Sequence, residues 1–229
     1  MRYKILAISL FSMTLLAGCG TGSPGLTGQT PKAGTATAKN WPDPDTELRD
    51  RLALLKREYD KGTYGWRDYN DARISAILRA WGAGTRLRLS SLAAVYEDGG
   101  VAWATYNKHR MDVLTQAYGD PLADRLAMLA EIYQDGGITW TTYNQTRIGM
   151  IEKAYGERLS TRISLLARVY EDGGIQWRAY NDLRVKFIMA ARYESLELRL
   201  DLLEKAYEDG GISYSDYQTY RKQILSEGK

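Results

Sequence analysis

A single spacing of 37 residues runs through the chain from about residue 47 to residue 229. Two series of tyrosine, two of arginine and one of tryptophan repeat at this spacing, and the tryptophan becomes tyrosine in the fifth copy. The series are Tyr59, Tyr96, Tyr133, Tyr170 and Tyr207; Tyr69, Tyr106, Tyr143, Tyr180 and Tyr217; Arg51, Arg88, Arg125, Arg162 and Arg199; Arg73, Arg110, Arg147, Arg184 and Arg221; and Trp66, Trp103, Trp140, Trp177 and Tyr214. A period this strict, with no insertion, indicates a tandem repeat protein.

Each unit predicts two helices joined by a short turn. In the first half of a unit, apolar residues recur at i, i+4, i+7 and i+11, which places them on one stripe of a helix, as from Leu122 to Tyr133 in the third unit. Asp-Gly-Gly follows in units two to five, and glycine accepts the left-handed conformation that ends many helices. A second helix is expected next, from about Trp103 to Tyr118 in the second unit.

The predicted fold is therefore all-α, a solenoid-like array of five antiparallel αα-hairpins. One hairpin is too small to bury both of its apolar stripes, so stacking of neighbours completes the core. The expected units span about residues 47–83, 84–120, 121–157, 158–194 and 195–229. The alternative architecture joins the second helix of each unit to the first helix of the next, giving long up-and-down helices.

Two junctions between units carry specific expectations. Asp120-Pro121 predicts a helix start at the third unit, with aspartate as the N-cap and proline in the first turn. The junction at residues 191–194 has neither glycine nor proline. We expect the helices on either side of it to run on as one bent helix.

The N-terminus resembles that of a bacterial lipoprotein. Arg2 and Lys4 precede an apolar run that is too short to span a membrane stably, and the run ends in Leu-Ala-Gly-Cys at residues 16–19. This resemblance to a lipobox implies a signal peptide at residues 1–18 and a diacylated Cys19, the only cysteine of the chain. Gly20, where some sorted lipoproteins have aspartate, implies the outer membrane of a Gram-negative bacterium, facing the periplasm or the surface. A plain signal peptide with a chance cysteine is the alternative.

Residues 19–46 form the predicted linker between this anchor and the repeats. Glycine, threonine, serine and alanine dominate it, and four of the five prolines of the chain lie in it. Such a segment buries too little apolar surface to offset the entropy of ordering it. A flexible chain of this length has a root-mean-square reach of roughly 28 Å.

The second helix of each unit carries a candidate binding face. In the third unit, Trp140, Tyr143, Asn144 and Arg147 are spaced so that one helix face presents all four. Rigid aromatic rings and arginine are typical anchors at interfaces, and repeated rows of them suit an extended partner such as a glycan strand or a long helix. The candidate residues are Trp66, Tyr69, Arg73, Trp103, Tyr106, Arg110, Trp140, Tyr143, Arg147, Trp177, Tyr180 and Arg184.

The same residues also have a structural interpretation. Tryptophan would pack on the leucine stripe, asparagine would bond backbone groups near the Gly-Gly turn, and arginine would pair with an acidic residue of the turn. For the arginine series of the first helices, such as Arg125, the sequence favours ion pairs between neighbouring units, and a row of anion contacts is the alternative.

Composition argues against several classes of function. A net charge of +3 gives no concentrated basic character for nucleic acid, and one histidine excludes a multi-histidine metal site. Asp-Gly-Gly lacks the alternating carboxylates of a calcium loop, and no nucleotide-binding glycine motif is present. We expect no enzyme, no metal and no cofactor.

The fifth unit resembles the short C-terminal hairpin module called SHOCT. The residues that carry the resemblance are Leu200, Leu203, Tyr207, Gly211-Ile212-Ser213, Asp216-Tyr217, Arg221 and Leu225. The chain departs from that module in its tandem arrangement and in a tryptophan two residues past the turn isoleucine. The resemblance implies a non-catalytic interaction or oligomerisation module.

The sequence thus predicts a lipid-anchored envelope repeat protein that acts as an adaptor or scaffold for an envelope protein, its own copies included. One alternative is a lipoprotein that binds peptidoglycan or another glycan. A second alternative is a lipoprotein that excludes phages or plasmids.

Overall fold

The computed structural model describes residues 42–117 and 119–227. The predicted signal peptide, Cys19 and residues 19–41 of the predicted linker lie outside them. Within the described residues there are ten α-helices and no strand, which confirms the predicted all-α class. The helices are α1 (Pro44–Asp60), α2 (Trp66–Arg79), α3 (Thr85–Glu97), α4 (Trp103–Thr115), α5 (Leu122–Gln134), α6 (Trp140–Lys153), α7 (Leu159–Glu171), α8 (Trp177–Ala190), α9 (Leu196–Glu208) and α10 (Tyr214–Glu227).

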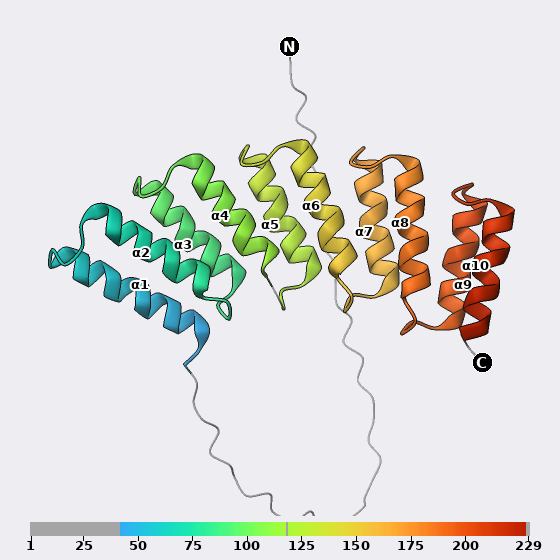
Figure 1. Ribbon diagram of the computed structural model, residues 1–229, viewed down its shortest axis with the longest axis horizontal. Helices are drawn as coiled ribbons and strands as arrows, with labels where there is room; N and C mark the ends of the chain where they lie inside the picture. The colour runs from blue at the N-terminus through green and yellow to red at the C-terminus, as the bar shows by residue number, and fades with distance from the viewer. Residues whose placement is uncertain (1–41, 118, 228–229) are drawn as a thin grey trace, which may run out of the picture. The chain divides into compact units, whose positions relative to one another are not determined.

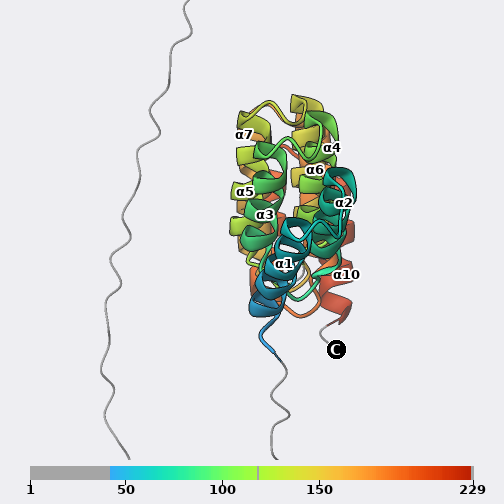
Figure 2. The same ribbon diagram turned by 90° about the vertical axis from the view of Figure 1, so that its left-hand side faces the viewer.

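The helices pair into five antiparallel hairpins that follow one another in a row (Figure 1). The main contacts join helices that are consecutive in the chain, as expected for a repeat array. Figure 2 shows α3, α5 and α7 in one layer and α2, α4 and α6 in the other. The turns within hairpins lie along one edge of the row, called the turn edge here, and the connections between hairpins lie along the opposite edge, the junction edge.

Each turn within a hairpin is closed by a glycine in the left-handed conformation. In the second hairpin, Gly99 has φ 75° and its amide donates to the Tyr96 carbonyl over 2.8 Å, while the Gly100 amide donates to the Val95 carbonyl over 2.8 Å. These two bonds form a Schellman cap, which reverses the chain at once. The first hairpin uses Gly62, with φ 79°, in the same way.

All four connections between hairpins separate two distinct helices, so the alternative of long fused helices is wrong. The expected bent helix across residues 191–194 is also wrong. There, α8 ends at Ala190 and Ser195 caps α9 by accepting the Leu198 amide over 3.2 Å. Arg199 donates from Nε to the Ile188 carbonyl over 3.0 Å. The Arg199 side chain thus donates to a carbonyl near the end of α8, and this helix ends without a glycine or a proline.

Two other helices, α1 and α5, start at residues that differ slightly from the expected ones. The first helix begins at Pro44, three residues inside the predicted linker, because Asp43 accepts the Thr46 amide over 3.1 Å as an N-cap. The cap position of α5 is Pro121 rather than Asp120. The Asp120 carboxylate instead accepts a hydrogen bond from the Thr85 hydroxyl of α3.

The apolar stripes meet between the two layers in two clusters. The first includes Leu48, Ile77, Leu92 and Val113 of the first two hairpins. The second begins at Leu114 and continues through the last three hairpins, and its last member is Ile224. Among the described helices, none is both long enough and apolar enough to cross a membrane.

Candidate functional site

Three aromatic rings meet at the turn edge of every hairpin. In the second hairpin, Tyr96 stacks on Tyr106 with ring centroids 4.8 Å apart and planes 7° apart. Trp103 lies tilted against both, at 5.3 Å from Tyr96 and 5.7 Å from Tyr106. The same stacked pair recurs in the other four hairpins, and in the fifth Tyr214 stands 5.9 Å from Tyr207 in the place of the tryptophan. Offset and tilted rings of this kind stabilise each other beyond their burial alone.

The three rings differ in exposure. The tyrosine of the even-numbered helix is buried in three hairpins and half-buried in the other two, at Tyr143 and Tyr217. The tryptophans are far more exposed: Trp66 by 44%, Trp103 by 40%, Trp140 by 41% and Trp177 by 39%. They therefore pack on the tyrosines at the rim of the hairpin and leave a large part of the indole open, whereas the structural interpretation of the sequence placed them on the leucine stripe.

Burial also sets the titration of the inner tyrosines. Loss of solvent raises the pKa of Tyr106, Tyr143 and Tyr180. The neighbouring guanidinium opposes this rise in the pKa, and the aspartate bound to that guanidinium adds to it. The hydroxyls of these three inner tyrosines therefore stay protonated at neutral pH.

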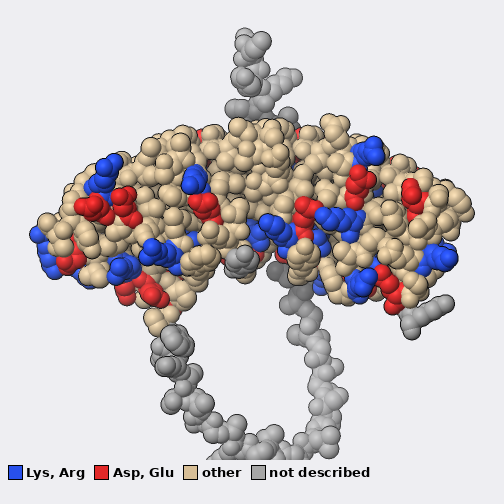
Figure 3. Space-filling view, in the orientation of Figure 1, with Lys and Arg blue, Asp and Glu red and all other residues tan. Residues whose placement is uncertain are grey.

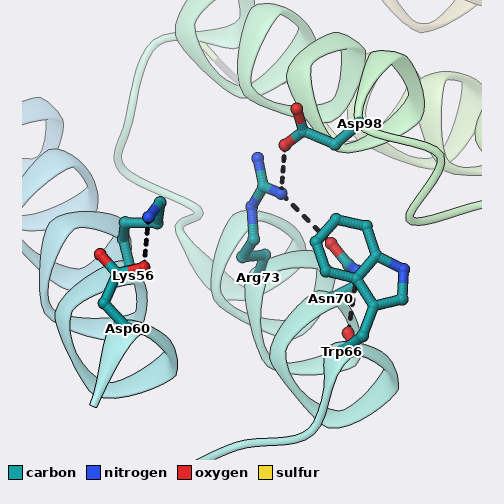
Figure 4. A network of polar contacts seen from close by, with 6 residues as sticks. All are labelled: Lys56, Asp60, Trp66, Asn70, Arg73 and Asp98. Carbon is teal, nitrogen blue, oxygen red and sulfur yellow. Dashed lines mark hydrogen bonds and ion pairs between the residues drawn. The ribbon is translucent and has the colours of Figure 1, made fainter. Parts of the chain in front are cut away.

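The arginine of each candidate face joins its hairpin to the next one. Arg73 donates from Nη1 to Oδ2 of Asp98 over 2.7 Å, and its guanidinium carbon lies 5.0 Å from the Tyr69 ring centroid (Figure 4). The arginine side chain is only 10% exposed and the aspartate 51%. The equivalent pairs are Arg110–Asp135, Arg147–Asp172 and Arg184–Asp209. In each, the aspartate belongs to the Asp-Gly-Gly turn of the following hairpin, so the structure brings the predicted arginine and turn acid together across the junction.

The asparagine beside each arginine packs on the second glycine of that turn. Asn70 donates from Nδ2 to the Trp66 carbonyl over 2.9 Å and accepts from Arg73 over 3.2 Å (Figure 4). A β-carbon on Gly100 would stand 2.4 Å from Oδ1 of Asn70. The same close approach occurs at Gly137, Gly174 and Gly211. The asparagine thus bonds its own helix, and the second glycine is required because only a residue without a side chain fits against it.

The two end hairpins depart from this set where they have no neighbour. The first hairpin carries Lys61 and Thr63 at the positions of Asp98 and Gly100. The fifth hairpin carries Gln218 at the asparagine position, and its Arg221 is exposed. The aspartate, the second glycine and the asparagine are therefore present only where another hairpin adjoins them, as expected if they serve the junction, whereas the arginine is kept at Arg221. These replacements, at Lys61, Thr63 and Gln218, are readable in the sequence.

Three arginines of the odd-numbered helices, Arg88, Arg162 and Arg199, cap the preceding helix. Arg88 donates from Nε to the Ile77 carbonyl and from Nη2 to the Leu78 carbonyl, both over 3.0 Å, and burial lowers its pKa. Arg162 and Arg199 make the same pair of bonds. The expected partner was an acidic side chain, and Arg199 alone of these three pairs with one, Glu227 of its own hairpin. The carbonyls at a helix C-terminus carry partial negative charge and otherwise lack partners, which explains the contact.

A series of acidic residues at the junction edge was missed by the sequence analysis. Asp120, Glu157 and Glu194 are spaced by 37 residues. Glu194 accepts the Leu159 amide of the preceding hairpin over 2.8 Å, and Glu157 accepts the Leu122 amide over 3.3 Å. They satisfy free amides at helix N-termini, as Asp120 does for the hydroxyl of Thr85. Their spacing was the available signal, but the identity of the residue changes from aspartate to glutamate.

The exposed and half-buried rings that remain form a row along the turn edge. We call this surface the aromatic row: Tyr59, Trp66, Tyr96, Trp103, Tyr133, Trp140, Tyr170, Trp177, Tyr207 and Tyr214. On the face seen in Figure 3, charged side chains of both signs gather away from the turn edge, which is mostly uncharged. No group of three histidine, cysteine or acidic side chains in the described ranges is placed to hold a metal ion.

Comparison with known proteins found no match. No model of a protein family matches the chain, and no curated protein matches it either.

Proposed function

We propose that this chain is a lipid-anchored adaptor of the bacterial cell envelope that binds an extended macromolecular partner along the aromatic row. The observation that supports this most is the open indole of one tryptophan in each of four successive hairpins. Indole and phenol rings give large contact areas at a low cost in conformational entropy, which makes them frequent anchors of binding energy. The arginine and asparagine of the candidate face belong to the junctions and not to the contact with the partner.

The regular array favours an extended partner over a small ligand. Each hairpin offers one aromatic cluster, and the junction contacts hold successive clusters in a fixed relation. Several weak contacts made at once by a rigid row give an overall affinity that far exceeds that of one contact. An adaptor or scaffold needs this property, and we propose no catalytic step.

The anchor is the second part of the proposal. The Leu-Ala-Gly-Cys motif supports lipidation of Cys19 after removal of residues 1–18, and Gly20 supports the outer membrane. The glycine- and threonine-rich segment that follows would let the array stand off the bilayer by roughly 28 Å. The resemblance to the SHOCT module also supports an interaction role. Replacement of Cys19 by alanine should abolish labelling with an alkyne-bearing palmitate and release the chain from the membrane fraction.

The binding surface is tested by photo-crosslinking in living cells. A photoreactive residue at Trp140, in the aromatic row, should capture a discrete protein. The control carries the same residue at Lys108, which is exposed on α4 outside the row. Capture at Lys108 but not at Trp140 would contradict the aromatic row as the contact surface.

The glycan alternative has its own measurement. If the purified chain sediments with isolated peptidoglycan sacculi, and Trp103→Ala with Trp140→Ala abolishes this, the partner is a glycan and the adaptor proposal fails. If sacculi leave the chain in the supernatant while the crosslink at Trp140 persists, the partner is a protein. Circular dichroism of the double variant checks that the helices persist.

A further inference from the structure

In the first hairpin, an open groove lies between α1 and α2. It is on the side with which every later hairpin packs against the hairpin before it. It encloses about 1040 Å³. Small residues such as Ala72, Ala76 and Ala80 line it, and Leu54 stands at 39% exposure on its α1 wall. Arg51 lies in the same wall and is exposed. The groove therefore combines apolar surface with exposed charged side chains: Arg57 and Arg79 line it beside Arg51, as do Glu47 and Asp50.

The other junctions of the chain show what fits such a groove. In the second hairpin, the position of Arg51 is taken by Arg88, which binds carbonyls in the last turn of α2. In the fourth and fifth hairpins, Arg162 and Arg199 bind the last turns of α6 and α8 in the same way. Three of the four inner grooves thus hold a helix C-terminus on an arginine equivalent to Arg51.

The first hairpin keeps only one half of this interface. At the turn edge, Lys61 and Thr63 replace the aspartate and glycine that receive an arginine and an asparagine elsewhere. At the junction edge, Arg51 is retained, and small residues such as Ala72 and Ala76 line the groove. A helix that ends in the groove is therefore accommodated, whereas one that brings an arginine to the turn edge meets the charge of Lys61.

We propose that this groove binds the C-terminal turn of an amphipathic helix from a partner protein, with Arg51 donating to its last carbonyls. The partial negative charge of a helix C-terminus complements the guanidinium. A second copy of the chain is disfavoured because its terminal α10 would bring Arg221 against Lys61. The groove shares no residue with the aromatic row, so this proposal stands or falls independently of the proposed function.

A peptide based on the chain itself provides the probe. The segment of residues 140–157 contains α6, and its Ile151 and Glu152 carbonyls accept hydrogen bonds from Arg162 at an inner junction. The probe is a labelled synthetic peptide of this segment with Asn144→Ala and Arg147→Ala. It lacks the two side chains that Thr63 and Lys61 of the first hairpin would not accommodate. Fluorescence anisotropy with the purified full chain in detergent should detect binding, and the unaltered peptide should bind more weakly.

Two variants of α1 decide the assignment. Arg51→Ala should weaken binding of the altered peptide about tenfold, because hydrogen bonds to a charged group are lost. Arg49→Ala removes the same kind of side chain from outside the groove and should leave binding unchanged. Both residues are exposed, so circular dichroism should show an intact fold for each.

The proposal is overturned if neither peptide binds, or if Arg51→Ala binds as tightly as the unaltered chain. It is also overturned if analytical ultracentrifugation shows dimers that Arg51→Ala dissociates, because the occupant is then a second copy. Binding that persists in Trp140→Ala but is lost in Arg51→Ala separates this groove from the aromatic row.

Discussion

The junction between the second and third hairpins and the junction between the third and fourth are alike at one edge and different at the other. At the turn edge both carry the full set: Arg110 reaches Asp135 over 2.8 Å, and Arg147 reaches Asp172 over 2.9 Å. At the junction edge, Arg162 is buried and bonds two carbonyls of α6. Its counterpart Arg125 is only half-buried, and Nε of Arg125 is buried without a hydrogen-bond partner among the described residues.

The connecting segments explain this difference. Helix α4 ends at Thr115, one position before the equivalent end of α6 at Lys153, and the connection after it contains Gly119 with φ 93° and Pro121. The carbonyl groups at the end of α4, which would accept hydrogen bonds from Arg125, are therefore not placed like those at the end of α6. The apolar core also divides here, between Val113 and Leu114. The repeated motif thus makes the turn edge uniform, whereas the junction edge depends on a connection whose sequence varies.

Replacement of the buried arginine should produce the largest difference between the two junctions. Arg162→Met keeps an apolar stem but loses two hydrogen bonds from a charged group and the contact of the guanidinium with Phe187, at 4.3 Å from its ring centroid. We expect the free energy of unfolding in urea to fall by about 3 kcal/mol. Arg125→Met should lower it by less than about 1 kcal/mol, since it loses no such pair of bonds. Equal losses would mean that the two junctions are energetically the same.

Substitution of the second glycine should affect both junctions equally. Alanine at Gly174 places a β-carbon 2.3 Å from Oδ1 of Asn144, and alanine at Gly137 places one 2.4 Å from Oδ1 of Asn107. Either substitution should destabilise the chain by about 2 kcal/mol in urea unfolding, because the hairpins must move apart. Gly149→Ala is the matched control: it lies within α6 with no atom near its β-carbon and should stabilise by about 1 kcal/mol. A neutral Gly174→Ala would refute the close approach as a requirement.

The architecture could be predicted from the sequence, but the hairpin that supplies the partner of each polar residue could not. Regular periodicity was enough for ten helices and their pairing, because every unit repeats the same apolar stripe. A strict period leaves open which neighbour a residue faces. Arg73 could face the turn of its own hairpin, at Lys61, or that of the next, at Asp98, and it binds Asp98. Only the end hairpins, with Lys61 and Gln218, break this ambiguity.

Local rules failed where a tertiary contact decides the outcome. Residues 191–194 contain no residue that ends helices, yet the side chain of Arg199 and the cap at Ser195 separate α8 from α9. The exposure of the tryptophans was equally out of reach. It depends on the tyrosine of the odd-numbered helix, against which the indole packs in a tilted arrangement.

A smaller and equal loss is expected from the turn-edge ion pairs. Asp172→Asn leaves Arg147 without a carboxylate, and Asp135→Asn does the same to Arg110. Each should cost about 1 kcal/mol in urea unfolding, because the aspartate is half-exposed and solvent screens the pair. Glu171→Gln, next to Asp172 and also exposed, should change little. A loss at Asp172 several times that at Asp135 would show that the turn edges are not equivalent.

The mildest test uses alkaline pH. Burial raises the pKa of Tyr106, at the second junction, and of Tyr143, at the third. A raised pKa in the folded state means that the unfolded chain releases these protons first, so stability is unaffected below the ordinary tyrosine pKa of about 10 and falls as pH rises through the raised value. Tyr106→Phe and Tyr143→Phe should each reduce this loss, and by similar amounts, in urea unfolding measured from neutral pH to above pH 10. A reduction for one variant alone would place the difference between the junctions at the turn edge as well, contrary to the equivalence argued from the ion pairs and glycines.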